Sequence, residues 1–376
     1  MKPAVYADYA ATAPLRESAR EAMRPWLERE FGNPSAADTY SQLPRHAVRE
    51  ARETIARILG ARTDEIYFTS GGTESDNWAV KGRALACHGG RPGHLIISAI
   101  EHHAVLEPCA FLERLGWKVT RLCPDREGII RPETVGAALR PDTALVSVMA
   151  ANNEIGTVQD IPALAKAAGE AGVAFHTDAV QAMGHIPLRV DPAPVCLLSA
   201  SAHKFGGPKG IGFLYVRHGT ALEPLHHGGG QERGMRAGTE NVAGIVGMAA
   251  ALSESVSEME HEQVRLEELR ERLILSLREA GLDFRINGGA WHLPGSLSLS
   301  FAGQDGRMLV YLLDRKGIAV AAGSACNSRE IAVSHVLSAT GVPDRYIKGT
   351  VRITLGRESS GEDVDRIASE IVGLVR

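Results

Sequence analysis

A lysine that precedes a glycine-rich turn is the residue of this chain best placed for covalent chemistry. Lys204 ends the run Ser201-Ala202-His203-Lys204, which follows the apolar segment 195–198 and precedes Gly206 and Gly207. At the end of a buried strand a lysine is partly desolvated, so its amine loses its charge more easily and becomes a nucleophile. A single loop lysine is more often a solvated surface residue. Other site residues elsewhere in the chain must decide between these readings.

The second candidate reactive group is Cys326, one of five cysteines. It lies in the run 321–328 of small residues, which is typical of a loop, and a thiol in a polar loop is open to reaction. The other four cysteines lie in or beside apolar stretches, as small buried residues do. Their odd number, wide spacing and lack of a Cys-x-x-Cys motif support neither a disulfide framework nor a zinc knuckle. An incidental loop cysteine is the alternative for Cys326.

Polar residues follow each apolar strand that the middle of the chain predicts. Strands are expected over residues 65–69, 95–98, 144–149, 173–176 and 195–198. Because most alternate with helical patterns, they indicate a largely parallel sheet covered by helices on both faces. A ligand of such a sheet binds beyond the carboxyl ends of its strands. This rule brings eight residues to one rim: Thr73, His102, Asn153, Asp178, Gln181, Ser201, His203 and Lys204.

The turn at residues 70–76 has the composition of an anion site. Gly71 and Gly72 let backbone N–H groups approach a phosphate, and the start of the following helix favours negative charge. The spacing is neither that of a Walker motif nor that of a Rossmann fingerprint. Thr73 and Asp76 also have the spacing of a helix N-terminal cap. The alternative to an anion site is therefore a turn that only connects the strand to the helix.

Each rim residue has a simpler explanation as well. His102 and His103 could form a metal pair, but adjacent residues seldom face the same way and no third ligand has zinc spacing, so no metal site is predicted. Asp178 could cap a helix, and Asn153 and Gln181 could form turns or be satisfied buried amides. The shared position of all eight residues favours a site.

Composition excludes several classes of function. Hydrophobic residues make up 44% and charged residues 23%, as in soluble globular proteins. A net charge of −4 and a pI near 6.4 give no electrostatic reason to bind nucleic acid or an anionic membrane directly. We find no run of about 18 apolar residues and no signal-peptide pattern, so we expect a cytoplasmic protein.

The length of 376 residues indicates two domains. We expect a large, ligand-binding domain over residues 14–258, and a small domain from residues 1–13 and 259–376, which carries the Cys326 loop. An amphipathic helix from about Ser253 to Ala280 would connect the two.

Further elements follow from local patterns. Ser360 and Asp363 have the spacing of a capping box for a C-terminal helix over residues 362–375. Apolar periodicity predicts helices over residues 14–29 and 43–59. Alternation and apolar runs predict strands of the small domain over residues 297–301, 318–320 and 351–354.

Seven segments together resemble the cysteine desulfurases of the NifS/IscS type, which belong to the class V aminotransferases. They read FTSGGTESDN at 68–77, NNEIG at 152–156, HTD at 176–178, SAHK at 201–204, GGGQERGMRAGT at 228–239, GSAC at 323–326 and VRITLGR at 351–357. In order and spacing they span nearly the whole chain. The resemblance implies an α/β fold, the type I fold of pyridoxal-phosphate-dependent transferases. In it a large domain holds a mostly parallel seven-stranded sheet between helices, and a smaller domain is α+β.

The same resemblance implies pyridoxal 5'-phosphate as cofactor and assigns residues to it. Lys204 would hold the cofactor as a Schiff base and later move the Cα proton, and Asp178 would pair with the ring nitrogen. His102 would lie against the ring and relay protons, and Gln181 would bond the ring oxygen. The remaining cofactor contacts implied are those of Gly72, Thr73, Asn153, Ser201, His203 and, from the neighbouring subunit, Thr239.

For the substrate, the resemblance implies that Arg352 binds the carboxylate of L-cysteine, assisted by Asn153 and Asn33. The thiolate of Cys326 would attack the substrate sulfur, leaving L-alanine and an enzyme persulfide. The same thiol could briefly ligate a nascent iron–sulfur cluster, and no resident metal is expected.

The implied partners are a second copy of the chain, in a homodimer with shared sites, and a sulfur-acceptor protein. The acceptor would be an iron–sulfur scaffold or an enzyme of tRNA or DNA thiolation. A selenocysteine lyase, an aminotransferase and a non-catalytic sulfur-relay partner are the alternatives. The thiol of Cys326 argues against the aminotransferase, and intact Lys204 and Asp178 argue against the relay partner.

Overall fold

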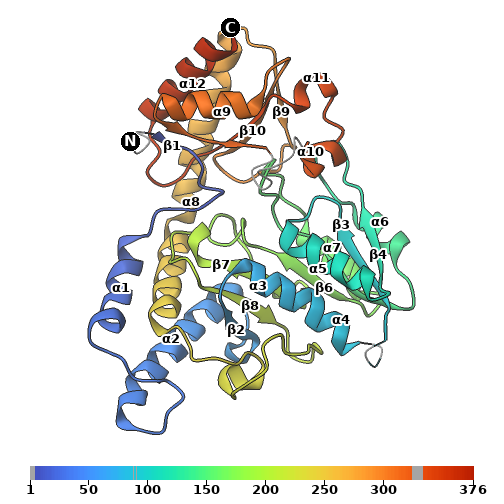
Figure 1. The fold of residues 1–376 in the computed structure, drawn as a ribbon, viewed down its shortest axis with the longest axis vertical. Coiled ribbons are helices and arrows are strands. Elements are labelled where there is room, and N and C mark those ends of the chain that lie inside the picture. The colour runs from blue at the N-terminus through green and yellow to red at the C-terminus, as the bar shows by residue number, and fades with distance from the viewer. Residues whose placement is uncertain (1–4, 88, 90, 324–332) are drawn as a thin grey trace.

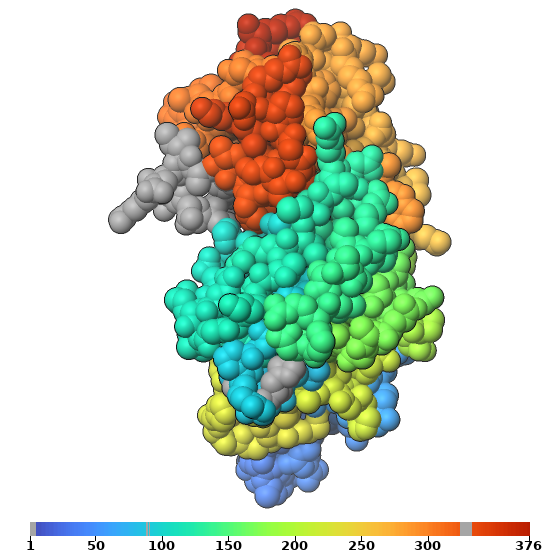
Figure 2. All heavy atoms as spheres, turned by 90° about the vertical axis from the view of Figure 1, so that its right-hand side faces the viewer, coloured from blue at the N-terminus to red at the C-terminus, as the bar shows by residue number. Residues whose placement is uncertain are grey.

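The computed structural model describes residues 5–87, 89, 91–323 and 333–376. Cys326 therefore lies outside the described residues. A larger body surrounds a seven-stranded sheet, and a smaller body above it surrounds a four-stranded sheet (Figure 1). In the space-filling view the smaller body is orange to red, and the larger one below it runs from blue through teal and green to yellow (Figure 2). The predicted fold, with a mostly parallel seven-stranded sheet between helices, is confirmed.

The seven-stranded sheet positions the polar rim. Its order is β2-β8-β7-β6-β5-β3-β4, and all neighbours are parallel except β8, which is antiparallel to both β2 and β7. The bounds are Ile66–Thr69 (β2), Gly212–Val216 (β8), Leu197–Ser201 (β7), Ala174–Asp178 (β6), Thr143–Ser147 (β5), His94–Ser98 (β3) and Lys118–Leu122 (β4).

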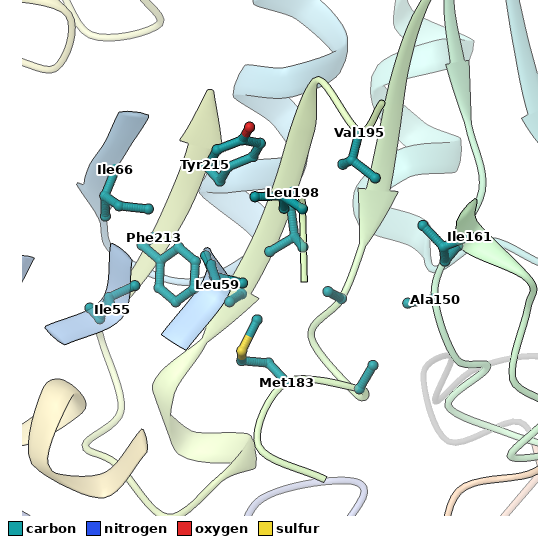
Figure 3. Packing of buried hydrophobic residues seen from close by; sticks show 14 of the residues in the cluster. Ile55, Leu59, Ile66, Ala150, Ile161, Met183, Val195, Leu198, Phe213 and Tyr215 are labelled. Carbon is teal, nitrogen blue, oxygen red and sulfur yellow. The ribbon is translucent and has the colours of Figure 1, made fainter. Parts of the chain in front are cut away.

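Alternate strand residues feed two separate cores, because successive side chains of a strand point to opposite faces. Leu198 and Phe213 pack in one core, which Figure 3 shows, whereas Leu197 and Leu214 pack in the other. Helices of the first face are α2 (Gln42–Leu59), α6 (Pro132–Ala138), α7 (Ile161–Gly169) and the first half of α8 (Val242–Glu279). Those of the second face are η3 (Trp78–Gly82), α4 (Arg83–Ala86) and α5 (His103–Arg114).

The smaller body has its own core. An antiparallel sheet of order β12-β13-β10-β9 comprises Ala321–Ala322 (β12), Thr350–Thr354 (β13), Ser296–Phe301 (β10) and Phe284–Asn287 (β9). The N-terminal strand β1 (Val5–Tyr6) pairs with β11 (Ile318–Ala319), so the start of the chain joins this body. The helices here are the second half of α8, α9 (Gly306–Arg315), α10 (His335–Ala339), α11 (Asp344–Ile347) and α12 (Gly361–Val375). The predicted residue boundaries of the two domains stay a prediction.

The remaining helical elements lie along the large body. They are α1 (Glu17–Glu28), α3 (Gly72–Asn77), η1 (Thr39–Ser41), η2 (Thr63–Glu65), η5 (Ala202–Lys204) and η6 (Gln231–Gly234). The Ser360–Asp363 capping box of α12 is confirmed. The predicted cap at Thr73 and Asp76 is wrong, because α3 begins at Gly72 and contains both residues.

The predicted start of the connecting helix, near Ser253, is also wrong. α8 begins at Val242, where the Asn241 side chain accepts a hydrogen bond from the Gly244 N–H at 3.0 Å. The added turns are rich in glycine and alanine, which give no amphipathic signal. Among the described residues, α8 is also long and apolar enough to cross a membrane, by length and composition alone. Half of its most apolar window is buried inside the protein, which is typical of a core helix.

Candidate functional site

A cavity of about 660 Å³ lies at the carboxyl end of the parallel strands. All eight predicted rim residues line it, together with Gly72 and Arg352. The structure therefore brings together ten of the thirteen predicted site residues: Gly72, Thr73, His102, Asn153, Asp178, Gln181, Ser201, His203, Lys204 and Arg352.

Lys204 follows β7 in the short helix η5 and reaches the wall of the cavity. Its Nζ donates hydrogen bonds to the carbonyl oxygens of Ala10, at 2.5 Å, and of Ala11, at 3.0 Å. The same Ala10 oxygen accepts from the Gln181 Nε2 at 2.9 Å. The N-terminal segment thus holds the amine in the cavity. Sequence reasoning missed this segment because backbone carbonyls contact the lysine, and side-chain types do not reveal such contacts.

The turn before α3 requires its glycines. Gly71 has a φ of 148°, in the region that favours glycine, and a Cβ on Gly72 would lie 2.5 Å from Cγ2 of Val180. No side chain caps the Gly71 position, and the first N–H groups of a helix have no partner inside the helix. These donors lie in the cavity wall beside Ser201, so the turn is able to bind an anionic group such as a phosphate.

Asp178 ends β6 in the floor of the cavity. It is 4% exposed, and its Oδ1 accepts a hydrogen bond from the Val180 N–H at 2.9 Å. Burial raises its pKa to about 6, while that hydrogen bond and the charge of Lys204 act in the opposite direction. The carboxylate is therefore able to pair with a cationic or N–H group inside the cavity.

His102 is neutral at neutral pH. Burial, and then the charge of Lys204, lower its pKa to about 4. Its Nδ1 accepts a hydrogen bond from the Ala104 N–H at 3.1 Å and so caps α5. Because Nδ1 is an acceptor, the single ring proton lies on Nε2. Burial likewise lowers the pKa of His203 to about 4, and its Nδ1 lies 3.1 Å from the Thr12 hydroxyl.

Arg352, on β13, brings the smaller body to the cavity. Its Nη2 donates to the Asp8 carboxylate at 2.6 Å and its Nη1 to the Asn153 carbonyl at 2.9 Å. The Nε is buried without a hydrogen-bond partner in the described part of the chain. This guanidinium has donor capacity for a carboxylate ligand. Sequence reasoning missed Asp8, although an aspartate just after a short strand was a usable signal.

A second contact joins the two bodies at the same rim. The Ser334 hydroxyl, which caps α10, donates to the Glu154 carboxylate, and the His335 Nε2 donates to the Glu101 carbonyl at 3.0 Å. Burial raises the pKa of Glu154 to about 7. Glu154 was part of a quoted motif, but no role was predicted for it.

Two predicted site residues do not line the cavity, and a third is not described by the structure. Asn33 and Thr239 are exposed, and Cys326 lies outside the described residues. Asn33 and Thr239 belong to neighbouring loops, since the Ser35 hydroxyl donates to the Glu240 carboxylate at 3.3 Å. The roles predicted for these three residues stay predictions. In the described part of the chain, no group of three His, Cys, Asp or Glu side chains is placed to hold a metal ion.

Comparisons with known proteins agree with this geometry. The family model for class-V aminotransferases matches residues 5–367. A cysteine desulfurase IscS of Dictyoglomus turgidum is 51% identical over 97% of this chain and 93% of the relative. A solved NifS-like protein has a TM-score of 0.93 at 37% identity and covers 100% of this chain and 99% of its own. A structure of SspA in complex with cysteine has a TM-score of 0.83 at 38% identity, over 93% of this chain and 98% of its own.

Proposed function

The chain belongs to the class-V aminotransferase family, within its cysteine desulfurases, and from this premise we propose that it transfers the sulfur of L-cysteine to Cys326. One observation carries the proposal: the Lys204 amine, the Asp178 carboxylate and the Gly71–Gly72 turn line the same cavity. A covalent anchor, a partner for a ring nitrogen and a phosphate cradle are the three contacts that an aldehyde cofactor with a phosphate group requires.

The family uses pyridoxal phosphate, and the residues of the cavity fit this cofactor. The glycine turn leaves room where a Cβ would clash with Val180, and Ser201 and His203 lie beside it. Asp178 would bond the ring nitrogen and Gln181 the ring oxygen. When bound, the cofactor supplies an electron sink for the Cα of the substrate.

The residues of the chain orient the substrate and move its protons. Arg352 offers its guanidinium to the carboxylate of L-cysteine, and Asn153 lies beside it. The Lys204 Nζ takes the Cα proton, which requires the amine to be uncharged at that moment. His102 keeps a proton on Nε2, since Nδ1 is occupied by the Ala104 N–H, and is able to donate it.

The sulfur step balances within substrate and enzyme. The thiolate of Cys326 forms an S–S bond to the substrate sulfur as the Cβ–S bond breaks. The electron pair of the Cβ–S bond remains on the carbon skeleton, which takes up protons and leaves as L-alanine. The enzyme keeps the sulfur as a persulfide, and an acceptor protein for iron–sulfur assembly or for nucleic-acid thiolation would remove it.

A second copy of the chain would complete the site. Asn33 and Thr239 lie on one exposed surface, outside their own cavity, as expected if that surface meets the cavity of a partner. A reducing compartment, the cytoplasm, suits the free thiols of the described cysteines Cys87, Cys109, Cys123 and Cys196.

Two substitutions test the proposal. Lys204→Ala should remove the visible absorbance of the lysine-bound cofactor at roughly 400 nm. The same variant should not release sulfide from L-cysteine. Cys326→Ser should keep the absorbance and lose sulfide release. Mass spectrometry of the wild-type chain after exposure to L-cysteine should find one additional sulfur on Cys326. Sulfide release by Cys326→Ser at the wild-type rate would contradict the role of this thiol.

A further inference from the structure

Asp76 lines the cavity, but the reaction proposed above gives it no role. It lies inside α3, is 1% exposed, and its Oδ1 has no hydrogen-bond partner among the described residues. A buried carboxylate oxygen without a partner is costly, because burial removes the water that stabilises the charge. The state of Asp76 therefore needs a physical explanation.

The basic side chain beside Asp76 is a neutral histidine. In the described ranges, the one basic side chain at ion-pair distance is His176, whose Nε2 lies 3.6 Å from the Asp76 Oδ1. The two ring nitrogens of His176 contact the hydroxyls of Ser147, at 2.8 Å, and Ser199, at 3.0 Å. Complete burial lowers the pKa of His176 to about 3, so the ring is neutral. Asp76 thus faces a neutral imidazole.

The charged groups that act on Asp76 are acidic. Burial first, and then the charge of Asp178, raise the pKa of Asp76 well above its usual value; a hydrogen bond from the Ser199 side chain acts in the opposite direction, and the charge of Glu101 adds to the rise. Two nearby buried carboxyls cannot both ionise at low cost, so one of them retains a proton. Asp178 has the Val180 N–H at 2.9 Å and the charge of Lys204 in its favour, whereas a neutral hydroxyl, that of Ser199, stabilises the charge of Asp76. The negative charge is consequently more stable on Asp178.

We propose that Asp76 is a neutral carboxylic acid beside an ionised Asp178, so that the single negative charge of the two carboxyl groups lies on Asp178. Asp76 is then a positioning residue: it keeps Asp178 charged and available to the ring nitrogen of the cofactor. The inference rests on the proposed cofactor site, but it does not depend on which reaction the cofactor performs.

Infrared spectroscopy of the full-length holoenzyme in D₂O at pH 7 tests this directly. A protonated carboxylic acid has a carbonyl stretch separate from the bands of carboxylates and amides. The difference between wild type and Asp76→Asn should show the loss of one such acid band. Because burial raises the pKa of Glu101 to about 8 and that of Glu154 to about 7, Glu101→Gln and Glu154→Gln serve to identify the other acid bands. The exposed Asp314, changed to Asn, should leave the acid region unchanged.

A reciprocal measurement leaves Asp76 in place. In Asp178→Asn the neighbouring charge is gone, so the Asp76 acid band should disappear at a lower pH than in wild type. The proposal is overturned if Asp76→Asn removes a carboxylate band and leaves the acid bands intact, or if Asp178→Asn does not move the titration of the Asp76 band. Sulfide release is assayed separately on wild type. If wild type shows the acid band but releases no sulfide, the result contradicts the proposed function and not the protonation state of Asp76.

Discussion

At the scale of single residues, three histidines with lowered pKa values contribute to the response of stability to acid. The pKa values of His102 and His203 are lowered to about 4 and that of His176 to about 3, mainly by burial. Unfolded histidine titrates near pH 6.5. Between about pH 6.5 and 4 these three side chains therefore bind more protons in the unfolded chain than in the folded one, and their contribution to stability falls as the pH falls.

His102→Gln should reduce this loss. One histidine contributes at most about 1.4 kcal/mol of unfolding free energy per pH unit in that window. Urea denaturation of wild type and variant between pH 4.5 and 7 should show that the variant gains stability relative to wild type as the pH falls. His261, whose side chain is 79% exposed, provides the control, and His261→Gln should keep the wild-type slope. Equal slopes for wild type and His102→Gln would mean that His102 is charged in the folded protein.

Arg352→Lys should weaken substrate binding more than it slows turnover. A lysine has no planar fork, so it cannot replace the bonds of the two Nη atoms to Asp8 and Asn153 and still bind a carboxylate bidentately. We expect KM for L-cysteine to rise by roughly tenfold or more, as loss of about 1.5–3 kcal/mol of charged hydrogen bonding implies. Steady-state alanine formation measures it. Arg307→Lys on exposed α9 is the control, and an unchanged KM in Arg352→Lys would exclude the carboxylate contact.

The site residues that could be predicted are those whose side chains carry the chemistry. Lys204, Asp178 and His102 follow strands of a parallel sheet, and the carboxyl ends of such strands share one edge, so residue type and position sufficed. Ala10 escaped because it acts through its carbonyl oxygen. Asp76 was read as a helix cap, since a polar residue near a helix start gives the same pattern whether it faces solvent or a cavity.

At the scale of elements, the turn η6 is held in a strained conformation by a buried ion pair. Glu232 and Arg233 have φ values of 46° and 59°, which cost energy for residues other than glycine. Glu232 accepts two hydrogen bonds from Arg52, at 2.6 and 2.7 Å, and one from the Phe68 N–H at 3.0 Å. The side chains of Arg52 and Glu232 are 11% and 3% exposed. These contacts fix the turn that leads to Thr239.

Arg52→Met should therefore destabilise the protein strongly. It leaves the Glu232 carboxylate buried without its cation, at a cost of about 3–5 kcal/mol. Chemical denaturation measures this loss. Arg52→Met combined with Glu232→Gln should recover part of the stability, because the uncompensated charge is gone. Arg49→Met, one turn earlier on the exposed face of α2, should change stability by less than about 1 kcal/mol. A double variant no more stable than Arg52→Met would refute this explanation.

The elements themselves followed from the sequence wherever periodicity was strong. The prediction of a helix over residues 43–59 agrees with α2 to within a residue, since Val48, Ile55 and Leu59 are buried on one face. The first turns of α8 could not be predicted in this way. These turns pack small residues such as Gly247 against α1. Because glycine has no side chain, such a contact adds nothing to the hydrophobic pattern of the sequence.

At the scale of the whole molecule, one surface carries features that a single chain does not use. Phe31 and Tyr40 are 83% and 69% exposed and stack on each other with ring centroids 5.5 Å apart. Leu27 and Leu43 are also exposed, at 69% and 51%. Exposed large apolar side chains that contact each other, as those of Phe31 and Tyr40 do, favour contact with another protein. Ser35, in the same loop, bonds Glu240 beside Thr239, so the apolar residues and the residue predicted to reach a partner's cofactor lie together.

We expect this surface to join two copies of the chain. Light scattering should give about twice the mass of 40.2 kDa for the wild-type protein. Phe31→Glu would bury a charge in the interface, so the protein should shift to the monomer and lose bound cofactor on dilution, since Thr239 could no longer reach the second site. Trp291→Glu, which alters another aromatic residue that is 69% exposed, should remain a dimer. A monomeric Phe31→Glu variant with full cofactor content and full activity would show that each chain completes its own site.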